Sequence, residues 1–167
     1  MRGHNYRIGN GMPTTRKEYE KGSPAVRIAR FTTGKARDDY DLKVRLVSAE
    51  KVQIRHFAIE AARVAANKII AGEEEEDYFL EVRIYPHIIL RENKMIATAG
   101  ADRLQEGMRR AYGKPCALAA RVNIGTPILD ISIMKERLST AKAALKTAGS
   151  KLPKTYKVEQ VILNQKP

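Results

Sequence analysis

Three histidines, one cysteine and a run of carboxylates are the groups in this 167-residue chain that could support catalysis or bind a metal. His4, His56 and His87 are too far apart for a recognised metal-ligand spacing. His56 and Glu60 lie four residues apart on a predicted helix, but a zinc-protease motif needs a second histidine at that spacing. The sequence contains no Walker loop and no dinucleotide-binding fingerprint. We therefore predict no catalytic site, no metal site and no cofactor.

Cys116 is the single cysteine of the chain, so an internal disulfide or a thiolate metal cluster is excluded. This usage favours a reducing, intracellular setting. Basic neighbours would lower the pKa of the thiol, but no partner histidine is evident in the sequence. An enzyme that uses Cys116 or a pair of carboxylates remains an alternative, and alkylation of the thiol would test it.

The run from Glu73 to Asp77 places five carboxylates in a row. Carboxylate oxygens bind hard cations, but consecutive acidic residues do not specify a coordination shell. We interpret the run as a solvated turn, with a cation site as the alternative. Phosphate would repel it, so we expect it on a face that points away from a nucleic acid.

The segment from Thr98 to Cys116 is rich in arginine and is bounded by glycines near both ends. Leu104, Met108 and Tyr112 recur every four residues, which predicts a short amphipathic helix weakened by Gly107 by roughly 1 kcal/mol. We expect this basic loop to protrude from a sheet; an ordinary solvated surface loop is the alternative. Its candidate contact residues are Arg103, Gln105, Arg109, Arg110 and Lys114.

The first forty residues are punctuated by glycine and proline and show no helical stripe. We interpret residues 1–40 as an extended basic arm that binds a partner, and a disordered tail is the alternative. Tyr6 and Tyr19 are possible stacking side chains, and residues 25–31 resemble a strand. The candidate RNA-binding residues of the arm are Arg2, His4, Tyr6, Arg7, Arg16, Lys17, Arg27, Arg30, Lys35 and Arg37.

The rest of the chain contains both strand and helix patterns, which predicts a single domain of strands and helices over residues 41–163 and a tail at 164–167. Period-two alternation predicts strands at 42–47, 80–85, 118–124, 129–133 and 156–163. Gly125-Thr126-Pro127 predicts a tight hairpin between two of them. Helical spacing predicts helices at 54–71 and 137–148. The predicted buried stripe of the first is Ile54, Ala58, Ala61, Ala62, Ala65 and Ile69, and that of the second is Leu138, Ala141, Ala144, Leu145 and Ala148.

The overall composition narrows the class of partner. The chain has 31 Lys and Arg against 19 Asp and Glu, a net charge of +12, which predicts affinity for a polyanion. No apolar run approaches the ~20 residues of a membrane-spanning helix, and no signal peptide opens the chain. Nucleic acid is therefore the expected partner, with no membrane partner and no homo-oligomer. Aromatic residues make up only 6% of the chain, so few side chains could stack on the bases of a single-stranded nucleic acid.

Four sequence runs carry a family resemblance: EAARVAANK at 60–68, EVRIYPH at 81–87, NKMIATAGADRLQEGMRRAYGKP at 93–115 and ARVNIG at 120–125. They resemble the large-subunit ribosomal proteins of the L-ten-e family, the archaeal and eukaryotic counterpart of bacterial L-sixteen. The likeness extends from about residue 6 to residue 154. The chain lacks the C-terminal extension of the eukaryotic members, which favours the archaeal type.

The resemblance implies an α+β two-layer sandwich, with two helices packed on a mixed, mostly antiparallel sheet. It implies a structural constituent of the cytoplasmic ribosome that binds large-subunit ribosomal RNA beside neighbouring ribosomal proteins. The basic loop would face tRNA on the aminoacyl side of the peptidyl transferase region, and the protein would do no covalent chemistry. A free-standing RNA or tRNA chaperone, which would sediment away from ribosomes, is the alternative.

Overall fold

The computed structural model describes residues 1–12, 15, 18–71, 77–95 and 107–163 of the chain. These residues form two α-helices, α1 (His56–Ala71) and α3 (Leu138–Ser150), and three short 3-10 turns, η1 (Gly3–Asn5), η2 (Gly107–Arg110) and η3 (Lys135–Arg137). The strands are β1 (Thr32–Gly34), β2 (Leu42–Ser48), β3 (Val52–Arg55), β4 (Tyr78–Val82), β5 (Ile88–Glu92), β6 (Lys114–Val122), β7 (Pro127–Ile133) and β8 (Tyr156–Ile162).

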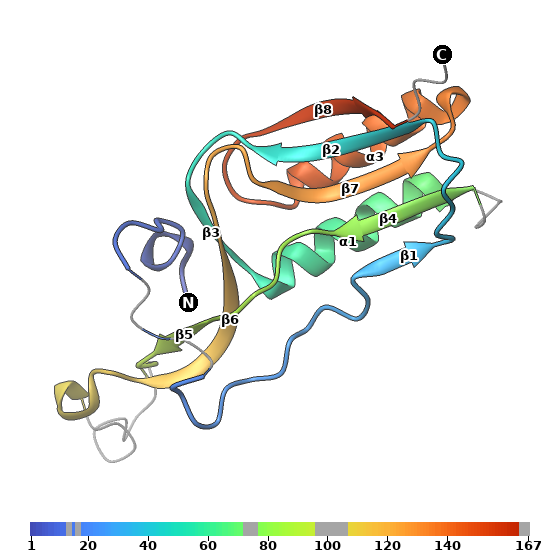
Figure 1. Cartoon of the computed structure of the whole chain (residues 1–167). Helices are drawn as coiled ribbons and strands as arrows, with labels where there is room; N and C mark the ends of the chain where they lie inside the picture. Colours follow the sequence, from blue (N-terminus) through green and yellow to red (C-terminus); the bar gives the residue numbers. More distant parts are fainter. Residues whose placement is uncertain (13–14, 16–17, 72–76, 96–106, 164–167) are drawn as a thin grey trace.

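The strands belong to two sheets rather than one (Figure 1). A five-stranded sheet has the order β1-β4-β7-β2-β8, and a three-stranded sheet has the order β3-β6-β5. Every strand pairing among the described residues is antiparallel. The α+β class is confirmed, whereas a mixed sheet was expected and no parallel pair occurs in the described part of the chain.

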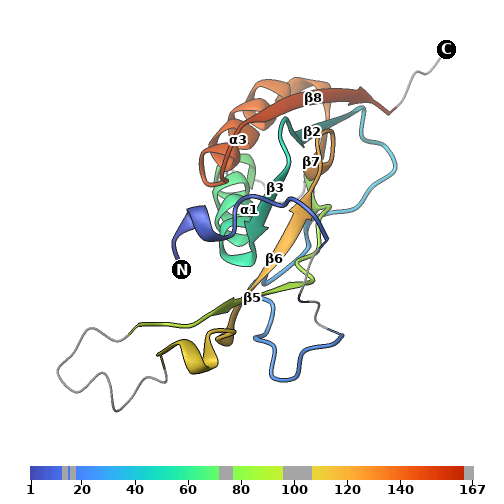
Figure 2. The ribbon, with the colours of Figure 1, turned by 90° about the vertical axis from the view of Figure 1, so that its left-hand side faces the viewer.

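Both helices lie on one face of the five-stranded sheet, which gives the expected two layers (Figures 1 and 2). Alternation in β2 places Leu42, Val44 and Leu46 against the helices and leaves Lys43 and Arg45 partly accessible on the other face. Burial of each large apolar side chain is worth about 1.5–3 kcal/mol, so this layer provides most of the favourable free energy of folding.

Alanines line the contact between the two helices. Ala62 and Ala66 of α1 and Ala141, Ala144 and Ala148 of α3 are fully buried. Small side chains let the helix axes approach closely while both helices still cover the sheet. The buried stripe predicted for α3 is confirmed at Ala141, Ala144, Leu145 and Ala148, and Leu138 is partly buried. The helix includes Gly149 and ends at Ser150, slightly later than predicted.

The first predicted helix begins two residues too early, and its predicted buried stripe is only partly right: Ala62 is buried, and Ala58 and Ile69 are partly buried against the core. Val52 to Arg55 form strand β3, and α1 starts at His56. Its buried residues are His56, Ile59, Ala62, Arg63, Ala66 and Ile70, whereas Ala61 is exposed. Ile54 is buried, but as part of the sheet. The helix is alanine-rich nearly all round, so helical spacing alone defines its inner face poorly.

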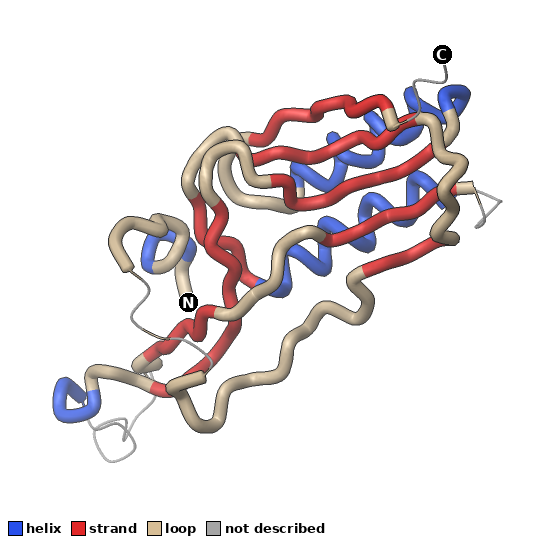
Figure 3. Tube along the Cα trace, in the orientation of Figure 1, coloured by secondary structure: helices blue, strands red, loops and turns tan. Residues whose placement is uncertain are grey.

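The predicted hairpin between 118–124 and 129–133 is also wrong. The turn at Gly125 is present, but β6 and β7 belong to different sheets. At the same place the chain passes from β2 to β3, again between the sheets, as the tube in Figure 3 shows. The two turns are joined because Ser48 N–H donates to the Thr126 carbonyl and Gly125 N–H donates to the Ser48 carbonyl, at 3.1 and 2.9 Å. Alternation identifies strands but does not say to which sheet each belongs.

Three further boundaries differ from prediction. Residues 25–31 form no strand; pairing with β4 begins where Val82 N–H donates to the Phe31 carbonyl, just before β1. Strand β4 covers Tyr78–Val82 instead of 80–85. Strand β6 starts at Lys114, inside the segment assigned to the basic loop. The predicted strands at 42–47 and 156–163 are confirmed to within a residue.

The corrected face of α1 can be tested by two truncations. Ile59→Ala removes a fully buried side chain, so it should lower the free energy of unfolding by about 2–5 kcal/mol. Val64→Ala, at a half-exposed position on the opposite side of the helix, should change it by less than about 0.5 kcal/mol. Chemical denaturation of both variants measures the two values, and similar losses would mean that the face is assigned wrongly.

Candidate nucleic-acid interface

The three-stranded sheet carries the basic loop at its far end. Strands β5 and β6 pair from Ile88–Ala119 to Glu92–Lys114, and the loop leaves from this end of the ribbon (Figure 1). Turn η2 lies there with no buried residue, and Arg109, Arg110 and Lys114 are exposed. A 3-10 turn stands where a short α-helix was expected, and Met108 and Tyr112 are exposed rather than packed. Arg103 and Gln105 lie outside the described residues.

The N-terminal arm lies across one face of the three-stranded sheet. Gln53 N–H of β3 donates to the Arg7 carbonyl at 2.9 Å, and Ile89 N–H of β5 donates to the Thr15 carbonyl at 3.2 Å. Between these two edges, Met1 and Tyr6 cover a small apolar cluster of Leu90, Ala117 and Ala119. The start of the arm is therefore bonded to its own domain before any partner binds.

The basic side chains of this part of the arm point outward. Arg2, His4 and Arg7 are exposed. Tyr6 is half-buried, and the Arg55 guanidinium lies 4.9 Å from the centre of its ring, so the tyrosine already has a cation–π partner within the chain. Tyr19 is exposed. Arg16 and Lys17 lie outside the described residues.

The second part of the arm runs along α1. Ile28 is buried, Arg27 N–H donates to His56 Nδ1, and Ala29 N–H donates to Glu60 Oε2, both at 3.3 Å. Glu60 also holds Arg63 through two hydrogen bonds of 2.9 and 2.6 Å, and this contact lowers the pKa of the Glu60 carboxyl.

Four basic candidates belong to this second part of the arm. Arg27, Arg30 and Lys35 are exposed, and Arg30 and Lys35 line a hollow beside Arg63 and Asn67. Arg37 lies 3.6 Å from Asp77, so part of its charge is neutralised within the chain. The arm thus presents cations at two places, over the small sheet and beside α1.

The groups considered for catalysis take structural positions. His56 is buried, and both desolvation and the nearby Arg27 and Arg55 lower its pKa. Cys116 is exposed, but its thiol donates to the Leu90 carbonyl, and partial desolvation, followed by the charge of Glu92, raises its pKa; the activation by basic neighbours that the sequence indicated is wrong.

Within the described residues no three His, Cys, Asp or Glu side chains gather as metal ligands, and Glu73–Glu76 lie outside them. None of the helices described is long and apolar enough to cross a membrane.

The comparisons with known proteins all point to one family. The family model described as ribosomal protein L16p/L10e matches residues 6–159. The large ribosomal subunit protein uL16 of Staphylothermus marinus is 52% identical over 145 residues, which cover 86% of this chain and 83% of the relative. The protein of the same name from Sulfolobus acidocaldarius is 47% identical over 166 residues, which cover 98% and 94%. The chain belongs to the ribosomal protein L16p/L10e family.

This L16p/L10e family member carries basic groups near the arm that the sequence analysis did not select. Arg121 on β6 donates from Nη2 to the Asn10 carbonyl at 3.0 Å. Arg121 and the exposed Lys51 line one hollow with the turn from Gly9 to Gly11. Arg121 occupies the strand face opposite Leu118 and Val122, so its outward direction was readable from period-two alternation. Its proximity to the arm was not, because the two segments are far apart in sequence.

The face of the five-stranded sheet away from the helices carries another group of charges. Arg45 Nε and Arg83 Nε lie 3.3 and 3.8 Å from Asp130 Oδ2, and Asp130 is only 1% exposed. Desolvation raises the pKa of the Asp130 carboxyl, although Arg45, Lys43 and Arg83 act in the opposite direction. Arg45 and Arg83 remain partly accessible, so this face presents guanidinium groups above a buried carboxylate.

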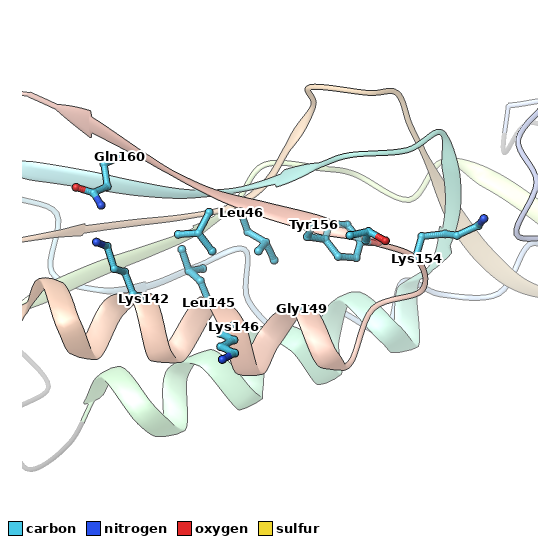
Figure 4. A pocket seen from close by; sticks show the side chains of 10 residues that line it. Leu46, Lys142, Leu145, Lys146, Gly149, Lys154, Tyr156 and Gln160 are labelled. Carbon is cyan, nitrogen blue, oxygen red and sulfur yellow. The ribbon is translucent and has the colours of Figure 1, made fainter.

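A groove runs between α3 and β8 (Figure 4). Leu46, Leu145 and Tyr156 contribute apolar lining, Lys142 and Gln160 lie at one end, and Lys154 lies at the other. Lys154 is paired with Glu50 at 3.0 Å, and Lys142 and Lys146 are exposed. Strand β8 pairs only with β2 among the described strands, and Val158 and Ile162 remain partly exposed on it. The groove is therefore lined by both lysines and apolar side chains.

The packing of the arm on the small sheet can be tested at Tyr6. Tyr6→Ala removes ring packing and the contact with Arg55, together roughly 1–2 kcal/mol, so the arm should detach more often. Hydrogen exchange at the Gln53 amide, which donates to Arg7, should accelerate about tenfold. Tyr19→Ala, at an exposed position of the same arm, should leave that rate unchanged. Equal effects would contradict the described seating of the arm.

Proposed function

We propose that this chain is a structural constituent of the large subunit of the cytoplasmic ribosome. Its basic arm would bind large-subunit ribosomal RNA beside neighbouring ribosomal proteins. Its basic loop would face tRNA on the aminoacyl side of the peptidyl transferase region. The proposal rests on family membership, because the relatives at about half identity are named as large-subunit proteins. On this proposal the protein does no covalent chemistry and holds RNA in a working geometry.

The position of η2 is the main support for the proposal that the basic loop faces tRNA. Arg109 and Arg110 are exposed at the end of a hairpin that projects from the body of the protein, as Figure 2 shows from the side. A β-ribbon is stiff along its length, so it can hold a cation at a fixed distance from the core. Guanidinium groups suit such a position because their planar forks bind phosphate bidentately and stack on bases.

The arm assignment is supported by exposed cations on a backbone that is already ordered. Arg2, Arg7, Arg27 and Arg30 present their side chains outward while neighbouring backbone groups bond to β3 and α1. Counterions released from RNA would favour binding, and less conformational entropy would be lost than for a free tail. The arm would then act as a preformed surface.

The loop assignment predicts a defect specific to tRNA. Arg109→Ala with Arg110→Ala should leave folding and subunit incorporation intact, because both side chains are exposed, but should weaken aminoacyl-tRNA binding by such ribosomes several-fold. Lys142→Ala with Lys146→Ala removes the same charge from α3 and should have no such effect. Filter binding of aminoacyl-tRNA measures both, and normal binding by the arginine variant would refute the assignment.

The arm assignment predicts a change in salt dependence. Arg30→Ala should lower the slope of log binding constant against log salt by about 1 for deproteinised large-subunit RNA, the value for one phosphate contact. Lys68→Ala, an equal charge change on an exposed position of α1, should leave the slope unchanged. Equal slopes for wild type and the Arg30 variant would mean that Arg30 makes no phosphate contact.

Sedimentation separates this proposal from an RNA chaperone. A ribosomal constituent should stay in the large-subunit peak of a sucrose gradient after a high-salt wash, because many contacts must break together. A free-standing chaperone should be recovered at the top of the gradient.

A further inference from the structure

Three side chains from distant parts of the sequence meet where the basic loop returns to the sheet. Glu20 belongs to the arm, Arg91 to strand β5, and Tyr112 follows η2. One oxygen of the Glu20 carboxylate lies 2.5 Å from Arg91 Nη1, and the other accepts a hydrogen bond of 2.7 Å from the Tyr112 hydroxyl. A single carboxylate therefore bridges a strand and the end of the loop. We call these three residues the clasp.

Arg91 completes the clasp on the loop side. Its Nε donates to the Tyr112 carbonyl at 3.2 Å, its Nη2 donates to the Gly113 carbonyl, and its guanidinium lies 3.8 Å from the centre of the Tyr112 ring. The planar fork of arginine can reach separated acceptors from three nitrogens, whereas the donors of lysine all lie on one nitrogen. Arg91 thus holds the Tyr112 backbone and ring while its remaining nitrogen holds the arm.

The clasp is connected to η2 through the backbone. Gly113 N–H donates to the Arg110 carbonyl at 3.1 Å, and Ala111 N–H donates to the Met108 carbonyl at 3.3 Å. Gly113 has φ +72°, and a Cβ there would lie 2.4 Å from the carbonyl carbon of Glu92. Only glycine permits this approach, so the end of the loop sits directly against the end of β5. Fixing Tyr112 therefore fixes the backbone of the turn that carries Arg109 and Arg110.

The arm side of the clasp is anchored as well. Thr15 is buried, and it exchanges hydrogen bonds with the backbone of Ile89 through its carbonyl and its hydroxyl. The Glu20 and Arg91 side chains are each 16% exposed, so water and salt screen their attraction less than that of a surface pair. The hydrogen bond to Glu20 is also the main cause of the raised pKa of the Tyr112 hydroxyl, which remains a donor at neutral pH.

We propose that the clasp transmits the position of the arm to the basic loop, so that seating the arm on RNA orients Arg109 and Arg110. Glu20 and Tyr112 are positioning residues in this scheme, and the tRNA part of the inference rests on the proposed function. A merely structural network would add stability to both segments independently. A coupling network makes the order of the loop depend on the order of the arm.

The coupling is measured in the full-length protein without RNA. Thr15→Val removes the hydroxyl that anchors the arm and keeps the side-chain volume. It should accelerate hydrogen exchange at the Gly113 amide about fivefold, the effect of one net hydrogen bond. In a Tyr112→Phe background, which keeps the ring over Arg91, Thr15→Val should have no further effect on that amide. Tyr19→Phe, an exposed neighbour of Glu20, is the matched control and should preserve the full response.

The outcomes are distinct. Loss of the Thr15 effect in the Tyr112→Phe background and in a Glu20→Gln background supports the clasp, because both variants break the same bridge. Additive effects in both backgrounds overturn it, whatever the loop binds.

Ribosomes that carry Tyr112→Phe test the consequence for tRNA. Weaker aminoacyl-tRNA binding supports the positioning role. Unchanged binding, in ribosomes where the Arg109 and Arg110 double variant does weaken it, overturns that role. Normal tRNA binding by the arginine double variant would instead refute the proposed function and leave the exchange result to decide the clasp.

Discussion

The arrangement of both sheets depends on the corner at Ser48. There β2 continues into β3 and β6 continues into β7, and the two turns are held together by a pair of backbone hydrogen bonds around a residue that is 1% exposed. Both segments of the chain therefore leave one sheet and enter the other at the same point. The register on one side, Val47 opposite Pro127, is linked to that on the other, Val52 opposite Val122. The buried side chains of both sheets fix this register, because a slip of one residue would turn their faces outward.

The two sheets that meet at this corner have different roles. The five-stranded sheet and its alanine-lined helices bury most of the apolar surface and provide stability. The three-stranded sheet has only a small apolar cluster on its outer face and uses it to seat the arm. The charged groups follow this division: carboxylates such as Glu60 and Asp130 are used to pair arginines within the fold, while many cations of the arm and loop remain exposed. Much of the positive charge of the described arm and loop is thus exposed instead of being neutralised inside.

Periodicity predicted the elements that pack on one clear face. Leu42, Val44 and Leu46 in β2 and the stripe of α3 are examples, because apolar and polar positions alternate without ambiguity there. It failed for β3, because Ile54 lies four residues before Ala58 and so extends the apolar spacing of the following helix. It also failed for the pairing of β6 and β7, since sheet membership depends on contacts between distant segments. The exposure of Arg109 and Arg110 on a basic protrusion was predicted by residue type, but the clasp was not, because Glu20 is separated from Arg91 by 71 positions and from Tyr112 by 92.

Strand β8 has a consequence for how the chain is supplied in the cell. Its outer edge has no strand partner within the described residues, and Val158 and Ile162 are partly exposed along it. An open edge with apolar side chains is a template for pairing between copies, and the rate of such pairing rises with the square of the free concentration. Chains made in excess of their assembly partner would therefore be removed by aggregation or degradation. A small free pool of the chain would keep this edge harmless.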